Sequence, residues 1–211
     1  MSSVLRRLLP VLGLCFFLPF ALPAQSASNA SAAVARSPVP GQKLHIPGVP
    51  NGGKISDVFY RGAQPKEQGL SELKKLGIQT IVDLRAEDPS RVAWESRRSE
   101  SLGMRFVHIP VNAWSPPTGE QVAEFLSIVH GDPRQKIFVH CHFGEDRTGV
   151  FVAAYRIALD QWSSEQAVKE MYFFGFHGFW HPSMKSFVLQ FPAHLNSAPA
   201  FASFRSPALQ P

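Results

Sequence analysis

Cysteine is almost absent from this sequence, which contains Cys15, Cys141 and no other. So small a number of thiols excludes the disulfide framework that stabilises many small exported domains. A basic stripe is also missing. The net charge is +5, but the excess Lys and Arg are spread along the 211 residues rather than gathered in one run. Because no nucleic-acid-binding motif is found either, we expect no nucleic acid partner.

Long apolar runs are lacking outside the first residues. The stretch 8–22 is apolar, follows the basic pair Arg6–Arg7, contains two prolines and precedes small residues. This pattern is typical of a secretory signal peptide, and the stretch is too short and too rich in proline for a membrane span. We therefore predict cleavage within residues 24–27, export to the periplasm or beyond the cell, and no stable membrane span afterwards. Cleavage would leave Cys141 as the only cysteine.

The composition divides the chain into four parts. Residues 1–24 are the predicted signal peptide. Residues 25–53 are rich in Ala, Ser, Pro and Gly, which predicts a flexible linker that becomes ordered only near residues 46–54. Residues 54–191 have the patterns of a folded domain, and residues 192–211 predict a loose tail.

Strand and helix patterns alternate within the folded part. The strands are expected at 58–61, 78–84, 104–109 and 136–140, and the helices at 67–76, 89–102, 118–130, 148–159, 163–171 and 182–190. This alternation predicts an α/β fold, a three-layer sandwich whose central, mostly parallel sheet is flanked by helices.

One short segment, His140–Gly149 (HCHFGEDRTG), has residues suited to chemistry and lies between the last predicted strand and a buried helix. A strand that turns tightly into a helix directs several backbone N–H groups at one point, where the helix dipole adds positive potential. Gly144 permits the turn, and Arg147 offers a planar fork that matches two phosphate oxygens. The segment therefore predicts a phosphate-binding loop.

The same positive potential favours the thiolate form of Cys141. A thiolate facing a bound phosphate monoester can displace the alcohol and form a phosphocysteine, which water then hydrolyses. Thr148 would donate a hydrogen bond to the sulfur as it leaves. This chemistry needs no metal ion or other cofactor, and we expect none.

The segment resembles the active-site loop of cysteine-dependent protein tyrosine and dual-specificity phosphatases, with His-Cys, five residues and then Arg-Thr-Gly. Three further stretches are similar to small bacterial dual-specificity-like members, namely DVFYRGAQP (57–65), IVDLR (81–85) and AVKEMYFFGF (167–176). The resemblance spans residues 55–180 and implies a phosphotyrosine-phosphatase-like fold.

The resemblance also implies roles for individual residues. Cys141 would be the nucleophile, Arg147 the phosphate clamp, and His140 a support that orients the loop and holds the thiolate. The substrate's phosphate would lie in the cradle formed by His142, Phe143, Gly144, Glu145, Asp146 and Arg147.

The sequence departs from this family at the general acid. Members usually carry an Asp on a separate loop upstream of the cysteine, but the corresponding loop here, 108–118, contains neither Asp nor Glu. Asp146 is our first candidate for that role, and the alternative is a structural carboxylate that bonds backbone or an arginine such as Arg85. Weaker candidates are Glu145, Glu120 and Asp88.

The substrate is left open by the sequence. No segment resembles the one that deepens the pocket of tyrosine-specific members, and a shallow pocket would accept phosphoserine, phosphothreonine or small phosphates. We favour a phosphorylated protein or a small aryl phosphate ester. Phosphoinositide and inositol-phosphate phosphatases commonly line this loop with lysines. Here Glu145 and Asp146 take those places and weaken the attraction for a polyanion, which His142, Arg61 and Arg85 would partly restore.

Two alternatives to a phosphatase remain. A non-catalytic phosphate-binding pseudophosphatase is an alternative because the acid loop lacks a carboxylate, and a rhodanese-like sulfurtransferase also uses a cysteine in an anion-binding loop. His140 and His142 flank Cys141, and His177 and His181 form a second histidine pair. The second pair is expected to lie near no Cys or acidic partner, and structural zinc needs four ligands, so no metal site is predicted. A set of aromatic residues is expected in the core or pocket wall, namely Trp114, Trp162, Phe173, Phe174, Phe176, Phe179 and Trp180.

Overall fold

The computed structural model describes residues 39–205. The predicted signal peptide, residues 25–38 of the predicted linker and residues 206–211 lie outside the described residues. The elements in chain order are β1 (Gln42–Lys43), β2 (Gly53–Lys54), β3 (Phe59–Ala63), α1 (Glu67–Lys75), β4 (Thr80–Arg85), α2 (Pro89–Ser101), β5 (Arg105–Val111), α3 (Gly119–Gly131), β6 (Ile137–Cys141), α4 (Asp146–Ala158), α5 (Ser164–Phe173), α6 (Pro182–Ser197) and the 3₁₀ helix η1 (Pro199–Phe204). Among these helices, none is long and apolar enough to cross a membrane.

The strands form one sheet in the order β1-β2-β3-β6-β4-β5. The pairs β3–β6, β6–β4 and β4–β5 are parallel, and β1 and β2 extend the sheet as antiparallel strands at one edge. Strand β6 is therefore central, with His140 beside Gly62 of β3 and beside Asp83 of β4. Loops that follow the carboxyl ends of parallel strands meet at one edge, where open α/β sheets bind their ligands.

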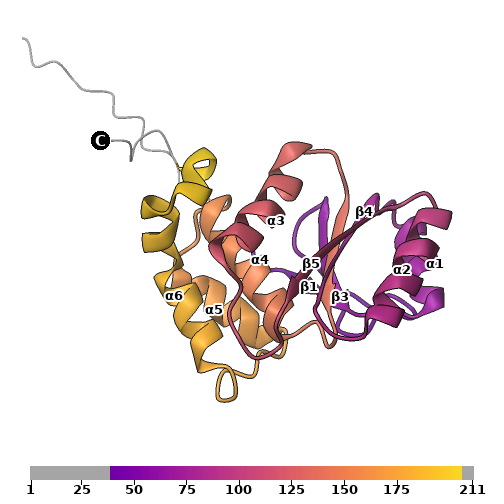
Figure 1. Cartoon of the computed structure of the whole chain (residues 1–211), viewed down its shortest axis with the longest axis horizontal. Helices are drawn as coiled ribbons and strands as arrows, with labels where there is room; N and C mark the ends of the chain where they lie inside the picture. Colours follow the sequence, from indigo (N-terminus) through magenta and orange to yellow (C-terminus); the bar gives the residue numbers. More distant parts are fainter. Residues whose placement is uncertain (1–38, 206–211) are drawn as a thin grey trace, which may run out of the picture. The chain divides into compact units, whose positions relative to one another are not determined.

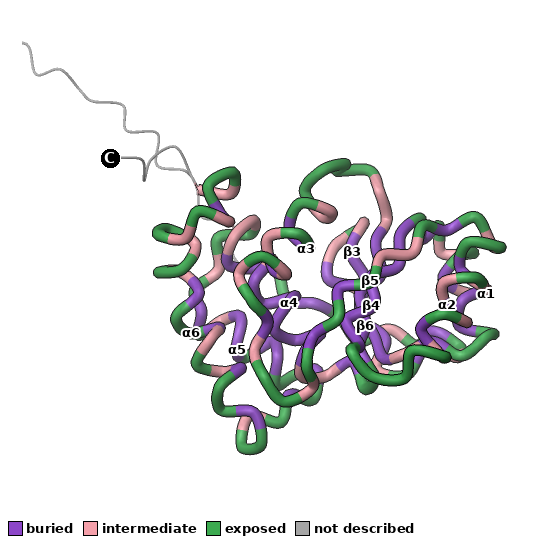
Figure 2. Tube along the Cα trace, in the orientation of Figure 1, coloured by how far each residue is buried: buried purple, intermediate pink, exposed green. Residues whose placement is uncertain are grey.

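Helices cover both faces of this sheet, with α1 and α2 on one face and α3 to α6 on the other (Figure 1). The smaller core, under α1 and α2, includes Leu70, Leu73 and Phe138. The larger core is packed around α4 and includes Phe125 and Phe151. In Figure 2 the buried backbone follows the central strands and α4. The predicted three-layer sandwich with a mostly parallel sheet is confirmed.

The predicted linker, 25–53, was expected to become ordered only near residues 46–54. Ile46 and Val49 are indeed buried in the smaller core. Order begins earlier than expected, because strand β1 pairs with β2 and the Gly41 N–H donates to a Glu170 carboxylate oxygen at 2.6 Å. The expectation of a flexible segment is therefore wrong for residues 41–45.

The predicted loose tail, 192–211, is also wrong for its described part. Helix α6 continues through Pro192 to Ser197, and η1 follows. The rings of Phe191 and Phe201 lie 5.2 Å apart and are both buried in the larger core. Two buried phenylalanines thus hold a segment whose average composition is that of a loop, and the folded unit extends on both sides of the predicted range 54–191.

Candidate active site

The phosphate-binding loop predicted from the sequence lies between β6 and α4. Cys141 is the last residue of β6, and Arg147 stands in the first turn of α4; both are buried. Gly144 has a φ of 68°, and a Cβ at this position would overlap the backbone of Gly62 in β3. Glycine is therefore required at 144 both by its backbone angle and by the close approach of the neighbouring strand.

The backbone N–H groups of residues 142–145 are free to bind an anion. In the part of the chain that the structure describes, none of them donates to a protein acceptor. The first turn of α4 follows directly, so its own free N–H groups and dipole face the same region. This arrangement is suited to a phosphate group.

Glu87 contacts Arg147 and was not considered at the sequence level. The Nη1 and Nη2 atoms of Arg147 each donate to one Glu87 carboxylate oxygen at 2.7 Å. Nη1 also donates to the Val111 carbonyl at 3.2 Å. Burial alone would lower the pKa of Arg147, but Glu87 and Cys141 outweigh it and raise that pKa. The hydrogen bond from Arg147 lowers the pKa of Glu87, so this carboxylate orients Arg147 and is unsuited to donate a proton.

A cavity of about 900 Å³ opens over Cys141 and Arg147. Its walls come from three connections of the fold, the β4–α2 connection with Glu87, the β5–α3 connection with Asn112 and Trp114, and the α5–α6 connection. A phosphate group occupies only a small part of such a space. The remaining volume leaves room for the alcohol or phenol that the phosphate is attached to.

Aromatic side chains surround the mouth of this cavity. Trp114, Phe143 and Trp180 line it and are 70%, 64% and 66% exposed. Phe174 and Phe176 are buried in the larger core, whereas Phe179 is 85% exposed and does not line the cavity. The expectation of core or pocket wall is therefore confirmed for Trp114, Phe174, Phe176 and Trp180. It is wrong for Phe179 and for Phe173, which is 52% exposed and does not line the cavity, while Trp162 is half-buried against Arg156.

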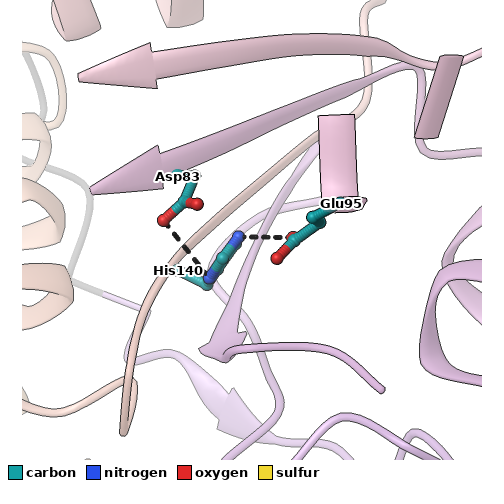
Figure 3. A group of neighbouring side chains, drawn as sticks. All are labelled: Asp83, Glu95 and His140. Atoms are coloured by element: carbon teal, nitrogen blue, oxygen red, sulfur yellow. Dashed lines mark ion pairs between the residues drawn. The ribbon is translucent and has the colours of Figure 1, made fainter. Parts of the chain in front are cut away.

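A buried ionic network supports the loop from behind (Figure 3). The imidazole of His140 lies between two carboxylates, with Nε2 2.8 Å from Glu95 and Nδ1 3.9 Å from Asp83. Nδ1 is also 3.2 Å from the Cys141 carbonyl oxygen. Arg85 donates to Asp83 at 2.6 Å and to Glu95 at 2.8 Å. All four side chains are fully buried.

The network keeps His140 charged. Burial by itself would lower the pKa of His140, but the carboxylates of Glu95 and Asp83 outweigh burial and raise it to about 9. At neutral pH His140 is therefore a cation, and its ring lies against the Cys141 carbonyl oxygen. The sequence predicted His140 as a support for the loop but did not identify Glu95, which lies in α2.

Asp146 lies in the cavity wall, but its carboxylate is already engaged. Oδ1 accepts the His177 N–H at 2.9 Å, and Oδ2 is 3.5 Å from Nε2 of His181. The alternative to a general acid was a structural carboxylate that bonds backbone or an arginine such as Arg85. The contact seen here is with backbone, at the His177 N–H. The role of Asp146 as general acid stays a prediction. Burial raises the pKa of its neighbour Glu145, which also lines the cavity.

The other predicted residues fall into two groups. The Arg61 and Arg85 side chains are fully buried and do not line the cavity, so neither contacts a substrate there, and their attraction for a polyanion stays a prediction. His142 is exposed and lines the cavity. The Thr148 hydroxyl is buried and has no hydrogen-bond partner within residues 39–205, and its bond to the departing sulfur stays a prediction.

The weaker acid candidates lie elsewhere. The Asp88 carboxylate accepts the Arg91 N–H at the start of α2, and neither Asp88 nor Glu120 is among the residues that line the cavity.

Histidine and carboxylate groups lie close together at two places, Asp83–Glu95–His140 and Glu145–Asp146–His177. In the first, Arg85 already supplies a cation to both carboxylates. In the second, Nδ1 of His177 is 3.4 Å from Glu145 and 3.8 Å from Asp146, as in ordinary ion pairs. The statement that His177 has no acidic neighbour is wrong, because the α5–α6 connection folds back onto the phosphate-binding loop.

Residues 51–185 match the family described as DSP-PTPase phosphatase fused to NAD+ kinase. The dual specificity protein phosphatase TpbA of Pseudomonas aeruginosa is 29% identical over 153 residues, which are 72% of this chain and 64% of that protein. A probable chloroplastic NAD kinase 2 of Oryza sativa is 33% identical over 106 residues, 49% of this chain and 11% of that protein. The chain thus spans at most 64% of the length of these curated relatives.

Solved structures show the same fold. The crystal structure of P. aeruginosa TpbA has a TM-score of 0.60 and 26% identity, covering 72% of this chain and 91% of its own. The catalytic core of the PP-IP phosphatase SIW14 from S. cerevisiae has a TM-score of 0.55 at 20% identity, covering 74% and 88%, and is alike in fold alone. With the family match over residues 51–185, these findings show that the chain belongs to the dual-specificity-like (DSP-PTPase) branch of the protein tyrosine phosphatase superfamily.

Proposed function

We propose that this protein hydrolyses phosphate monoesters through a phosphocysteine intermediate and without a metal ion, acting on a phosphorylated protein or a small aryl phosphate. The observation that carries this proposal is that Cys141 and Arg147 line the same cavity, beside backbone N–H groups that have no acceptor among the described residues 39–205. A thiol, a guanidinium fork and oriented N–H groups together suit attack on phosphorus.

The reaction follows from the roles of these groups. Arg147 and the loop N–H groups bind the phosphate oxygens and stabilise the charge that develops on them. The Cys141 thiolate then forms a bond to phosphorus as the ester oxygen leaves with its electron pair and takes up a proton. Water attacks the phosphocysteine in the second step and releases inorganic phosphate and the thiolate. Asp146 is our candidate for moving the proton in both steps.

An aryl substrate is favoured by two independent features. The loop 108–118 offers no carboxylate to protonate the leaving group, and a phenol leaves unaided more readily than an aliphatic alcohol. Trp114, Phe143 and Trp180 surround the cavity with rings that can stack on an aromatic leaving group. Phosphotyrosine within a protein is the substrate that combines both properties.

A second candidate is hydrolysis of inositol phosphates or phosphoinositides. The fold shared with the PP-IP phosphatase SIW14 favours it. The carboxylates of Glu145 and Asp146 in the phosphate-binding loop weigh against it, because a polyphosphate carries several negative charges that they repel. The pseudophosphatase alternative is weakened by the presence of both Cys141 and Arg147.

We further propose export, on the signal-like pattern of residues 8–22. Expression in a Gram-negative host followed by cell fractionation and N-terminal sequencing would test it. A mature chain that begins within residues 24–27 and lies outside the cytoplasm is expected. An uncleaved chain in the cytoplasm would show that this part of the proposal is wrong.

The catalytic proposal is tested by hydrolysis of para-nitrophenyl phosphate in EDTA, with the thiol reduced, comparing the protein with its Cys141→Ser form. We expect turnover in EDTA that the substitution abolishes, and a phosphorylated Cys141 after rapid acid quench. Turnover that persists in Cys141→Ser, or that requires an added divalent metal, would exclude the phosphocysteine route. If the folded, reduced protein shows no turnover but binds phosphate, the pseudophosphatase alternative is favoured.

A further inference from the structure

The side chain of Asn51 contacts the back of the phosphate-binding loop from a distant part of the chain. Its Nδ2 donates to the Gly144 carbonyl at 3.0 Å and to the Phe174 carbonyl at 2.9 Å, and it lies 3.4 Å from the Phe143 carbonyl. The Asn51 backbone has a φ of 48°, in the left-handed region that asparagine adopts more readily than most residues. One amide thus joins the loop to the end of α5.

Arg61 in β3 reaches the same carbonyl oxygen. Its Nη2 donates to Gly144, and its guanidinium lies 4.2 Å from the centroid of the Phe174 ring. Burial lowers the pKa of Arg61 to about 10, so the group stays charged at neutral pH. Its Nε and Nη1 atoms have no protein partner within residues 39–205. Removing this cation from water costs free energy, and it has few hydrogen-bond partners to recover that cost. Its hydrogen bond to the Gly144 carbonyl offsets part of it.

The planarity of the peptide unit gives these contacts a consequence on the opposite side of the loop. The Gly144 carbonyl belongs to the same rigid peptide as the Glu145 N–H, and the two bonds point in opposite directions. A carbonyl held toward Asn51 and Arg61 therefore directs the Glu145 N–H away from them. The weaker contact at the Phe143 carbonyl acts in the same way on the Gly144 N–H.

We propose that Asn51 and Arg61 form a carbonyl clamp, defined as their shared hold on the Gly144 carbonyl, that positions the loop N–H groups for phosphate. Both act as positioning residues, because they touch the outer side of the loop and do not line the catalytic cavity. Through the Phe174 carbonyl, Asn51 also fixes the start of the α5–α6 connection, from which His177, Trp180 and His181 enter the cavity wall. The clamp rests on the proposed function in one respect only, namely that phosphate is the anion that the loop binds.

Binding of inorganic phosphate tests the clamp without requiring turnover. The Cys141→Ser protein is titrated with phosphate by calorimetry, alone and with Asn51→Gly added. Glycine tolerates the φ of 48° at residue 51, so the substitution removes the amide without straining the backbone. We expect phosphate affinity to fall about tenfold, the effect of losing roughly one oriented hydrogen-bond donor.

The matched control is Gln161→Gly, since Gln161 is exposed, lies after α4 and has a φ of 59°. Its phosphate affinity is expected to stay unchanged. Asn51→Asp is a second variant, which keeps the shape of the side chain and replaces the hydrogen-bond donor by an acceptor. It should lower phosphate affinity at least as much as Asn51→Gly does. In the Cys141 protein, the Asn51 variants should lower kcat/KM while the folded fraction at the assay temperature stays complete.

Unchanged phosphate affinity in both Asn51 variants would overturn the clamp. A loss of thermal stability with unchanged affinity would assign Asn51 a structural role only. If the clamp is correct but the catalytic proposal is wrong, phosphate binding still falls in Asn51→Gly while no variant shows turnover. The two failures are therefore distinguishable.

Discussion

Cys141 and Arg147 at the floor of the catalytic cavity are buried, and His140 is buried beneath it without lining it. Glu87 and Glu95, from other parts of the fold, hold Arg147 and His140. At the rim of the cavity, Trp114, Phe143 and Trp180 are largely exposed and lie on connections between elements. Floor positions depend on one another through ion pairs and backbone contacts, so a change in one displaces the others. Rim positions are nearly independent. The floor is thus suited to determine the reaction, and the rim to determine which leaving group is accepted.

The largest effect is expected for Gly144→Ala at the floor. A side chain here imposes strain of about 1–3 kcal/mol at positive φ, and its overlap with Gly62 displaces a loop in which small shifts cost about a hundredfold in rate. We expect kcat/KM for para-nitrophenyl phosphate to fall about a thousandfold in total. Gly131→Ala is the control, because a Cβ there meets no atom within 4 Å. Near-normal activity of Gly144→Ala would show that the floor tolerates displacement.

The second-largest effect is expected in the free energy of unfolding, which should depend on pH because of the ionic network behind the loop. The folded pKa of His140 is raised to about 9, above the ordinary value of about 6.5. Its contribution is therefore complete below about pH 6.5 and is lost as the pH rises through 9, amounting to at most about 3 kcal/mol. Urea unfolding between pH 6.5 and 9.5 measures it, with His140→Asn as the variant that should lack this slope. Equal slopes in both proteins would exclude a charged His140.

A smaller effect on kcat/KM is expected for Glu87→Gln, which changes the partner of Arg147 at the floor of the cavity. Glutamine keeps the shape but removes the charge that holds both Arg147 nitrogens at 2.7 Å. We expect kcat/KM to fall about tenfold because Arg147 becomes less well oriented. Glu72→Gln, which removes only a surface ion pair with Lys75, is the control. An increase in activity would instead mean that Glu87 competes with phosphate for Arg147.

The smallest effect is expected at the rim. Trp114→Ala should raise KM for an aryl phosphate about threefold to tenfold, the scale of one aromatic contact, and leave kcat nearly unchanged. An alkyl phosphate should show no change in KM. Phe179→Ala serves as the control, since Phe179 is more exposed than Trp114 but does not line the cavity. A large fall in kcat for Trp114→Ala would contradict the separation between floor and rim.

The floor of the cavity could partly be predicted from the sequence, because its reactive groups lie in one short segment. The turn from strand to helix between Cys141 and Arg147 follows from local pattern, and local geometry then directs the N–H groups inward. The partners that hold this segment come from elsewhere. Asn51 and Gly144 are 93 positions apart, and Arg147 and Glu87 are 60 apart. No local pattern in a single sequence pairs such residues, so Asn51, Glu87 and Glu95 were missed.

The limits of the folded domain were predicted less well than its active-site loop, and for a different reason. Average composition assigned residues 25–53, apart from their end near 46–54, and residues 192–211 to loose segments, because Pro, Gly, Ala and Ser outnumber large apolar residues there. Order in such segments depends on a few long-range contacts, here the Gly41 hydrogen bond to Glu170 and the buried ring of Phe201. Hydrophobic burial is additive by area rather than by residue count, so a few large contacts outweigh many small residues.

From the carbonyl clamp we predict that the catalytic loop is completed late in folding. Gly144 reaches its position only after Asn51, 93 positions earlier, and Phe174, thirty positions later, have come together around Arg61. Contacts of such long range form slowly compared with a helix or a hairpin. Until they form, Cys141 lies in a chain with no ordered cradle around it. The phosphate-binding form of the loop therefore reports that the whole domain, from its first short strands to the end of α5, has folded.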